Sequence, residues 1–123
     1  MADNARRIAG TAQANIDGVT IPVVGTPTWR VATVTRESLV GMDGPHGYSE
    51  KPVTGFIAFQ ARDTRDILVQ GYQEMTNVTV TLILANGKRV TGTQMWNTEA
   101  VEVDSSEATL NLRFEGIDVR ETL

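Results

Sequence analysis

The chain has 123 residues, of which 41% are hydrophobic and 21% are charged, a balance typical of one soluble globular domain. It contains no cysteine, which excludes disulfides, thiolate catalysis and cysteine-ligated zinc. A net charge of −4 argues against a protein that binds nucleic acid through its backbone phosphates, because such proteins need a basic surface.

The first half of the chain is predicted to consist of short strands. Residues 1–10 show no usable periodicity and are predicted to form an N-terminal arm. Apolar residues alternate from Ala12, and Asp17-Gly18 predicts a two-residue turn into a second strand. Residues 28–36 and 53–61 predict two further strands because they are rich in β-branched and aromatic side chains.

Residues 37–52 are predicted to form a long loop. The stretch 40–52 holds three glycines, two prolines and the only histidine of the chain, a composition that opposes both a helix and a regular strand. Gly47 lies between His46 and Tyr48 and is predicted to adopt a positive φ. Long loops without regular structure are uncommon in small domains and usually serve a function.

The second half predicts one short helix and further hairpins. Residues 63–75 favour a helix of two to three turns, capped by Asp63 or Thr64. Residues 78–84 alternate clearly, and Asn86-Gly87 turns that strand into residues 88–96. A last hairpin pairs residues 98–104 with residues 108–115. About seven strands with short turns predict a mainly β fold, a small antiparallel barrel or sandwich with one short helix.

The sequence indicates neither a membrane segment nor a second domain. No stretch approaches the about 20 apolar residues of a membrane-spanning helix. The first residues also lack the apolar core of a signal peptide. We therefore expect a single domain over residues 1–123, without membrane insertion, made and assembled in a cytoplasm.

Candidate catalytic and metal-binding groups are sparse. His46 could form a triad with Ser38 or Ser49, but no strand–nucleophile–helix pattern surrounds either serine. Asp43 and Glu50 do not have the spacing of an EF-hand, and the glycine-rich stretch lacks the ending of a phosphate-binding loop. We therefore expect no enzymatic activity, no cofactor and no metal.

The acidic residues gather near the C-terminus. Residues 99–123 hold seven of the fifteen acidic side chains and two of the eleven basic ones. On the predicted last hairpin, alternation directs Glu102, Asn111, Arg113 and Glu115 away from the apolar side. Such a surface suits DNA that must slide past without sticking, and an ordinary solvent-exposed sheet face would give the same pattern.

Four fragments in a fixed order resemble the tail tube proteins of Mu-like contractile-tailed bacteriophages. The most specific is VGMDGPHGYSEKP at residues 40–52, which is similar to a GxDGxHGY string of that family. The others are IAGTA before the Asp17-Gly18 turn, VTLILANGK followed by Trp96, and VEVD followed by LRFEG. The resemblance spans residues 8–116.

This resemblance implies a structural virion protein of the phage tail. Hexameric rings would stack into a hollow tube inside a contractile sheath, with sheets of six subunits lining the lumen. The tube would surround a tape-measure protein, meet baseplate and tail terminator proteins, and carry viral DNA during ejection. Assembly would take place in the bacterial host cytoplasm.

The resemblance also assigns residues. The long loop would contact neighbouring subunits through Gly41, Asp43, Gly44, His46, Gly47 and Tyr48, and the lumen candidates would be Glu102, Asn111, Arg113 and Glu115. Two alternatives stay open. One is a tube protein of a secretion system or phage-like injection particle, and the other is a monomeric β-domain that binds a peptide or small ligand.

Overall fold

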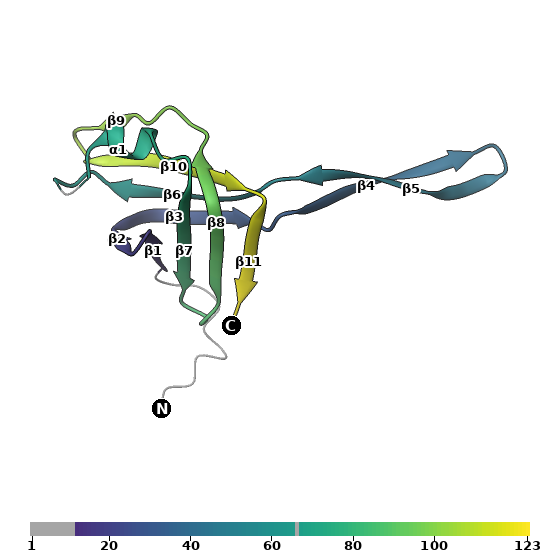
Figure 1. Cartoon of the computed structure of the whole chain (residues 1–123), viewed down its shortest axis with the longest axis horizontal. Helices are drawn as coiled ribbons and strands as arrows, with labels where there is room; N and C mark the ends of the chain where they lie inside the picture. The colour runs from purple at the N-terminus through teal and green to yellow at the C-terminus, as the bar shows by residue number, and fades with distance from the viewer. Residues whose placement is uncertain (1–11, 66) are drawn as a thin grey trace.

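The computed structural model describes residues 12–65 and 67–123, so the predicted N-terminal arm lies outside the described residues. The described part contains eleven strands and one helix (Figure 1). In chain order they are β1 (Ala12–Ile16), β2 (Val19–Ile21), β3 (Val23–Arg30), β4 (Thr33–Gly41), β5 (Gly44–Val53), β6 (Gly55–Arg62), α1 (Val69–Gln73), β7 (Val78–Leu84), β8 (Arg89–Asn97), β9 (Val103–Asp104), β10 (Thr109–Gly116) and β11 (Asp118–Thr122).

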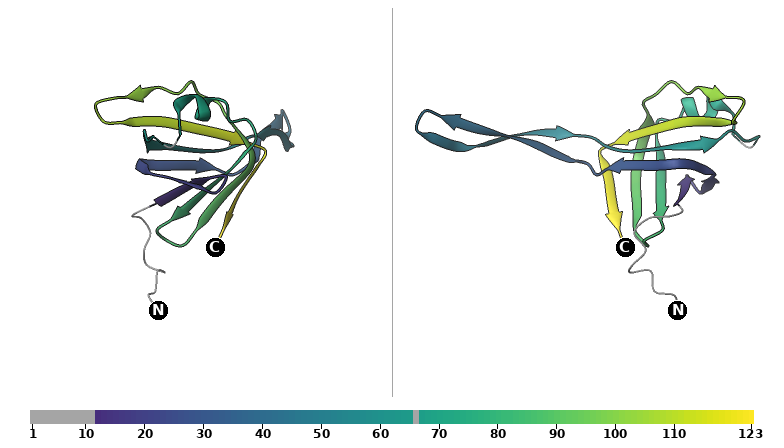
Figure 2. Two further views of the ribbon diagram at one scale, coloured as in Figure 1. Left: turned by 60° about the vertical axis from the view of Figure 1, so that its left-hand side comes forward. Right: turned by 180° about the vertical axis from the view of Figure 1, so that it is seen from behind.

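The body is one antiparallel sheet folded into two layers. The strand order is β2-β1-β7-β8-β10-β6-β3, with β11 paired to β8 and β9 paired to β10. Strand β8 connects the layers, because residues 89–93 pair with β11 whereas Trp96 and Asn97 pair with β10. The strands of the two layers run across one another (Figures 1 and 2). The mainly β, antiparallel prediction is confirmed, but the described strands form no closed barrel.

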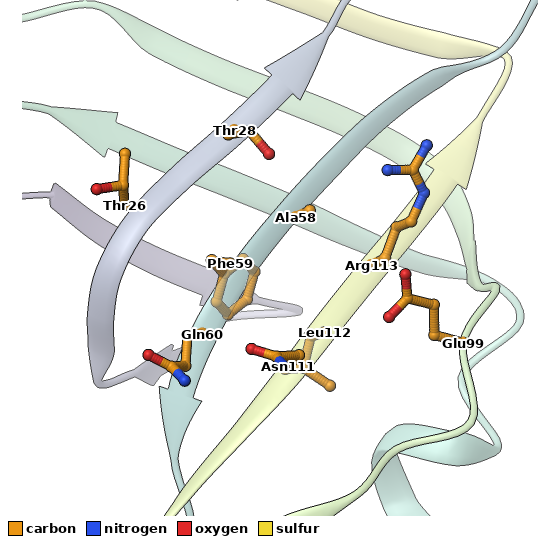
Figure 3. Close-up of a pocket in the computed structure, with 9 residues that line it drawn as sticks. All are labelled: Thr26, Thr28, Ala58, Phe59, Gln60, Glu99, Asn111, Leu112 and Arg113. Carbon is orange, nitrogen blue, oxygen red and sulfur yellow. The ribbon is translucent and has the colours of Figure 1, made fainter.

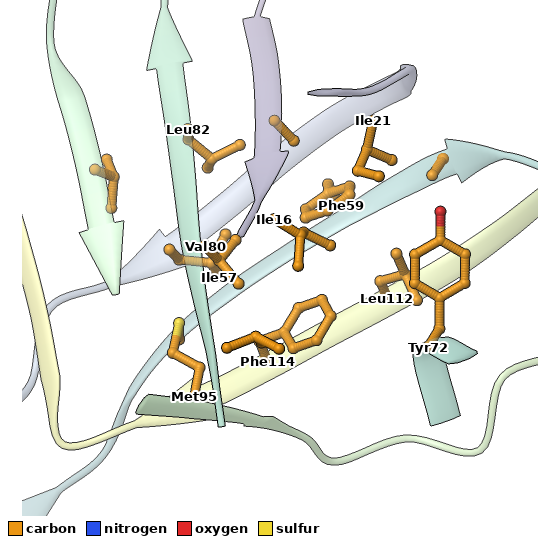
Figure 4. Packing of buried hydrophobic residues seen from close by; sticks show 14 of the residues in the cluster. Ile16, Ile21, Ile57, Phe59, Tyr72, Val80, Leu82, Met95, Leu112 and Phe114 are labelled. Atoms are coloured by element: carbon orange, nitrogen blue, oxygen red, sulfur yellow. The ribbon is translucent and has the colours of Figure 1, made fainter. Parts of the chain in front are cut away.

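The hydrophobic core lies between the two layers (Figure 4). Alternation along β6 and β10 directs every second side chain inward, and the rings of Phe59 and Phe114 stack with centroids 6.5 Å apart. Helix α1 adds the buried Tyr72. Burial of each large apolar side chain contributes about 1.5–3 kcal/mol. The buried side chains are those of Ala14, Ile16, Ile21, Ile57, Phe59, Ala61, Tyr72, Val78, Val80, Leu82, Val90, Met95, Leu110, Leu112, Phe114 and Val119.

Chain reversals occur at both predicted turns, but only the first is a two-residue turn. Asp17 and Gly18 have φ values of 51° and 88°, the signature of a type I′ hairpin turn, and the Gly18 N–H donates to the Asn15 side chain at 2.8 Å. The turn between β7 and β8 is one residue longer, because the Leu84 N–H donates to the Lys88 carbonyl at 2.9 Å across Ala85, Asn86 and Gly87, and here only Gly87 has a positive φ, of 88°. These turns place β2 against β1 and β8 against β7, and the pairing of β1 with β7 joins the two hairpins into one layer of the body.

Several predicted boundaries are wrong. The predicted strand 28–36 is interrupted after β3, and β4 begins at Thr33. The predicted last hairpin is reduced to the two residues of β9, because β10 pairs along its whole length with β6 instead. Strand β11 was not predicted, since Val119 is its only apolar side chain and gives no alternation.

The helix is shorter than predicted. It has five residues and is preceded by Leu68, without a side-chain cap. The predicted cap Asp63 instead donates its backbone N–H to the carbonyl of Ala108 at 2.6 Å, next to the paired β6 and β10. The local spacing favoured helix from residue 63, but pairing with the neighbouring strand determines the conformation there.

The predicted loop 37–52 is instead a regular two-stranded sheet. Strands β4 and β5 pair from Thr33 with Val53 to Gly41 with Gly44, with one irregularity beside Val40. Each strand of such a ribbon has an outer edge without a ladder partner, so a proline fits where its missing N–H would face outward. We call β4 and β5 the ribbon. It projects away from the body (Figures 1 and 2).

Candidate functional site

The ribbon has no covering layer in the described part of the chain. Every residue of 35–40 and of 45–52 is exposed. A lone two-stranded hairpin is at best marginally stable in water, because it buries little apolar surface. A ribbon of nine and ten residues per strand is therefore expected to need contacts with another molecule.

The ribbon carries apolar side chains toward its far end. Val40 is 70% exposed, and Met42 in the connecting turn is fully exposed. Nearer the body, Arg36 forms an ion pair with Glu50 at 3.2 Å, and its guanidinium lies 5.7 Å from the centre of the Tyr48 ring. The near half is thus charged and internally paired, whereas the far half offers apolar surface.

The six predicted loop residues lie at or beside the turn of the ribbon. Asp43 contacts His46, with 2.6 Å between Oδ1 and Nε2. The imidazole lies so close to Gly41 that a Cβ there would clash with its Cε1. Gly44 has a φ of 131°.

The two remaining residues of this set lie on β5. Gly47 has a φ of 140°, which confirms its predicted positive φ, and it pairs with Leu39. Tyr48 pairs with Ser38 and is exposed. The sequence motif thus forms the turn of a paired ribbon rather than part of a long loop without regular structure.

A second candidate surface is the outer side of β3, β6 and β10, which we call the polar face. Its cross-strand rows are Gln60 beside Asn111, Ala58 beside Arg113, and Phe56 beside Glu115. A shallow hollow of about 430 Å³ lies over this face (Figure 3). It is lined by Thr26, Thr28, Ala58, Phe59, Gln60, Glu99, Asn111, Leu112 and Arg113.

The structure places three of the four lumen candidates on the polar face. Asn111, Arg113 and Glu115 follow one another on β10 and point away from the core, as alternation predicts. Glu102 precedes β9 in the connection from β8 and lines an adjoining hollow together with Asn111. The face is not mostly acidic, because Arg30 on β3 also lies on it.

A third candidate site is a cluster of side chains where the ribbon joins the body. Thr54 connects β5 to β6, and its hydroxyl donates to Glu115 Oε1 at 2.7 Å. Arg30 donates from Nε and Nη2 to the carbonyl oxygen of Thr54 at 3.0 and 2.8 Å. The guanidinium groups of Arg30 and Arg113 both lie over the ring of Phe56, at 4.9 Å and 4.0 Å from its centre. We call these five residues the elbow cluster.

The elbow cluster also shifts the acidity of Glu115. Its pKa is lowered from the ordinary 4.5, first by the Thr54 hydroxyl and further by Arg113, whose Nε donates at 3.3 Å. Sequence reasoning missed Arg30, Thr54 and Phe56. Their meeting depends on the registers of β3 and β10 against β6, which no local pattern reveals.

The described residues offer no catalytic or metal centre. In residues 12–65 and 67–123, no three His, Asp or Glu side chains come together in a way that could hold a metal ion. Within the same ranges, no helix has the length and apolarity required to cross a membrane. The surfaces that remain are the ribbon, the polar face and the elbow cluster.

Comparisons with known proteins define the class. The fold is similar to a chain in the cryo-EM structure of the PVC sheath–tube complex of an extracellular contractile injection system, with a TM-score of 0.66, 8% identity, and coverage of 97% of this chain and 94% of that one. It is also similar to a chain of the PVC sheath/tube terminator, with a TM-score of 0.64, 10% identity, and coverage of 91% and 93%. At such identities the likeness shows a shared fold.

The sequence matches the family described as phage tail tube protein over residues 5–121. The chain therefore belongs to the phage tail tube protein family, and the resemblance drawn from the four sequence fragments is confirmed. This is a structural family that is not known to be enzymatic. A comparison with curated proteins gave no match.

Proposed function

We propose that this protein is the subunit of a hollow tail tube, in which hexameric rings stack end to end. The ribbon carries this proposal, because a projecting two-stranded sheet with both sides exposed needs a partner to cover it. Membership of the tail tube family supports another copy of the same chain as that partner. The contact is heterologous, so it generates rings or open stacks rather than a closed dimer.

The edges of the body sheet support the same conclusion. Strands β2 and β3 end the strand order and leave backbone groups without ladder partners on their outer sides. Exposed edges favour pairing with other chains, and edge-to-edge pairing around a ring removes them. Six copies joined in this way would form a continuous barrel, which one copy does not form alone.

The tube would function within a complete phage tail. Around it we place a contractile sheath, inside it first a tape-measure protein and then the viral DNA in transit, and at its ends the baseplate and tail terminator proteins. The solved relatives lie in a sheath–tube complex and a sheath/tube terminator, which supports the sheath and terminator. The protein would then be found in the virion tail after assembly in the bacterial host.

The turn of the ribbon is the proposed contact with a neighbouring subunit. The shaped turn of Gly41, Asp43, Gly44 and His46 presents Met42 outward, and Val40 lies beside it. These apolar side chains would be buried against the next copy.

Val40→Asp tests this contact, since it places a charge where burial is proposed. We expect the folded monomer to remain and tubes to disappear in negative-stain images and light scattering. Leu68→Asp is the matched control, because Leu68 is also 70% exposed but lies on the body. Normal tubes from Val40→Asp would remove the ribbon from the interface. A wild-type protein that stays monomeric at high concentration would refute the tube and favour the ligand-binding domain.

The polar face is the proposed wall of the lumen. It combines amide and hydroxyl groups with charges that neutralise one another, as in the pair Arg113–Glu115. A passing polyanion finds little excess positive charge to bind. The acidic Glu102 lies at the margin of this face and adds repulsion.

Cysteine labelling tests the lumen assignment, because the natural chain has no cysteine. In assembled tubes, Asn111→Cys should react with a small maleimide but not with one attached to a large polymer. Gln13→Cys, an exposed amide position on β1 in the other layer, should react with both. Reaction of Asn111→Cys with the large reagent in intact tubes would place the polar face outside.

A second candidate is a tube that delivers protein in an injection particle. The observation that favours it is the fold shared with chains of an extracellular contractile injection system. Particles purified from the producing cells would separate the two candidates. Packaged DNA supports the phage tail, whereas headless particles loaded with protein support the injection particle.

A further inference from the structure

The chain leaves the body and returns to it at one point, where the ribbon begins. Val31 and Ala32 lead out of β3, and Thr54 leads back into β6. The Ala32 N–H donates to the carbonyl of Val119 in β11 at 3.4 Å. Gly55 fits closely between these segments, since a Cβ there would lie 2.6 Å from the Val119 side chain and 2.8 Å from the Ala32 nitrogen. Both connections are therefore held against the body.

The elbow cluster holds the returning connection from two sides. Arg30 binds the carbonyl of Thr54, and Glu115 accepts the hydrogen bond of its hydroxyl. The guanidinium groups of Arg30 and Arg113, which come from the two strands beside β6, both lie over the ring of Phe56, and Arg113 also binds Glu115. Four side chains from β3, β10 and the start of β6 thus gather around Thr54, which belongs to neither strand of the ribbon, and two of them, Arg30 and Glu115, bind it directly.

We propose that Thr54, Glu115, Arg30 and Arg113 are positioning residues that fix the direction in which the ribbon leaves the body. This inference rests on the proposed function, because direction matters only if the turn of the ribbon must meet another copy. The lever is long. Ten residues at about 3.3 Å each extend roughly 30 Å, so a rotation of about 10° at the elbow displaces the turn by about 5 Å. A displacement of that size separates the far end of the ribbon from its contact site.

The hydroxyl of Thr54 is the group to remove. Thr54→Val deletes the hydrogen bond to Glu115 and keeps the size of the side chain, whereas Thr54→Ser keeps the hydroxyl. Thr33→Val is the matched control, since Thr33 is an exposed threonine at the same end of the ribbon whose side chain makes no hydrogen bond within the described residues. In Thr54→Val the pKa of Glu115, followed by NMR, should rise toward its ordinary value, and in the other two variants it should stay low.

The decisive measurement is made on the dispersed full-length chain, so it does not depend on tube formation. Spin labels at Met42→Cys and Gln13→Cys report the distance from the turn of the ribbon to the body by pulsed EPR. We expect Thr54→Val to broaden or shift this distance distribution, with Thr54→Ser and Thr33→Val unchanged. An unchanged distribution in Thr54→Val, with a raised pKa of Glu115 showing that the bond is lost, overturns the proposal.

Tube geometry gives a second, separate readout. If wild-type tubes form, Thr54→Val should alter their twist or rise, or reduce their yield at least several-fold, and Thr54→Ser should restore them. If wild-type protein forms no tubes, the proposed function fails while the EPR result still decides the role of the elbow cluster. A changed distance distribution combined with identical tubes would support the role of the elbow cluster in the direction of the ribbon and would overturn the part of that role that rests on the proposed function, the contact of the turn with another copy.

Discussion

Gly55→Ala is predicted to destabilise the protein by distorting the elbow. The added Cβ would lie 2.6 Å from two carbons of Val119 and 2.8 Å from the backbone nitrogen of Ala32. Real Cβ atoms do not approach so closely, and a backbone atom cannot rotate away as a flexible side chain can. Overpacking of this kind costs typically about 1–3 kcal/mol. At roughly 4 °C per kcal/mol for a domain of this size, the melting temperature should fall by about 4–12 °C.

Urea unfolding of the dispersed chain, followed by circular dichroism, measures this cost. Gly71→Ala is the matched control, because its Cβ meets only Ile67 Cγ2 at an ordinary 3.4 Å and lies in helix α1. There alanine should stabilise by up to about 1 kcal/mol. In a Val119→Ala background Gly55→Ala should cost less, since the contact with Val119 Cγ2 is removed while those with Val119 Cβ and the Ala32 nitrogen remain. A change below about 0.5 kcal/mol in Gly55→Ala, within the range of ordinary surface substitutions, would refute the close packing of the elbow.

The remaining predictions concern the ribbon and Glu115. Gly47→Val should leave the body folded by circular dichroism but stop tube growth, because a φ of 140° costs a non-glycine residue about 1–3 kcal/mol and distorts the ribbon next to its turn; normal tubes would contradict this. Glu115 has a lowered pKa in the folded state, so its contribution is present above the ordinary value of 4.5 and is lost as the pH falls through the folded pKa. The difference in unfolding free energy between wild type and Thr54→Val should therefore be present at pH 6 and vanish at pH values well below 4.5. A difference that persists in acid would mean that the Thr54 hydroxyl acts through another group.

The parts of the fold that could be predicted from the sequence are those set by local rules. Asp17-Gly18 specifies its turn because both positions need positive φ, and the strict alternation of residues 78–84 specifies β7. Strand β11 has a single inward side chain, Val119, and its place depends on pairing with β8. Long-range pairing also determines where the helix begins and reduces the predicted last hairpin to β9.

In the candidate site, too, the locally determined features could be predicted and those that depend on long-range pairing could not. The glycine-rich motif was identified from its composition, and Gly47 was assigned the correct sign of φ. Its regular pairing was missed, because composition describes each residue alone whereas a ribbon lets prolines occupy its outer edges. The residues of the elbow cluster that the sequence did not single out lie on β3, on β6 and in the connection before β6, and only the register of β6 brings Arg30 beside Phe56.

Glu115 connects the two surfaces on which the proposed tube depends. On β10 it follows Asn111 and Arg113 along the polar face, and through Thr54 it also holds the base of the ribbon. A substitution of Glu115 therefore changes both the proposed lumen wall and the direction of the ribbon, and its effect on assembly cannot be assigned to either. Asn111 has no such link to Thr54, and Thr54 does not line the hollow of the polar face. Variants at Asn111 therefore test the proposed lumen wall alone, and variants at Thr54 test the direction of the ribbon and tube assembly alone.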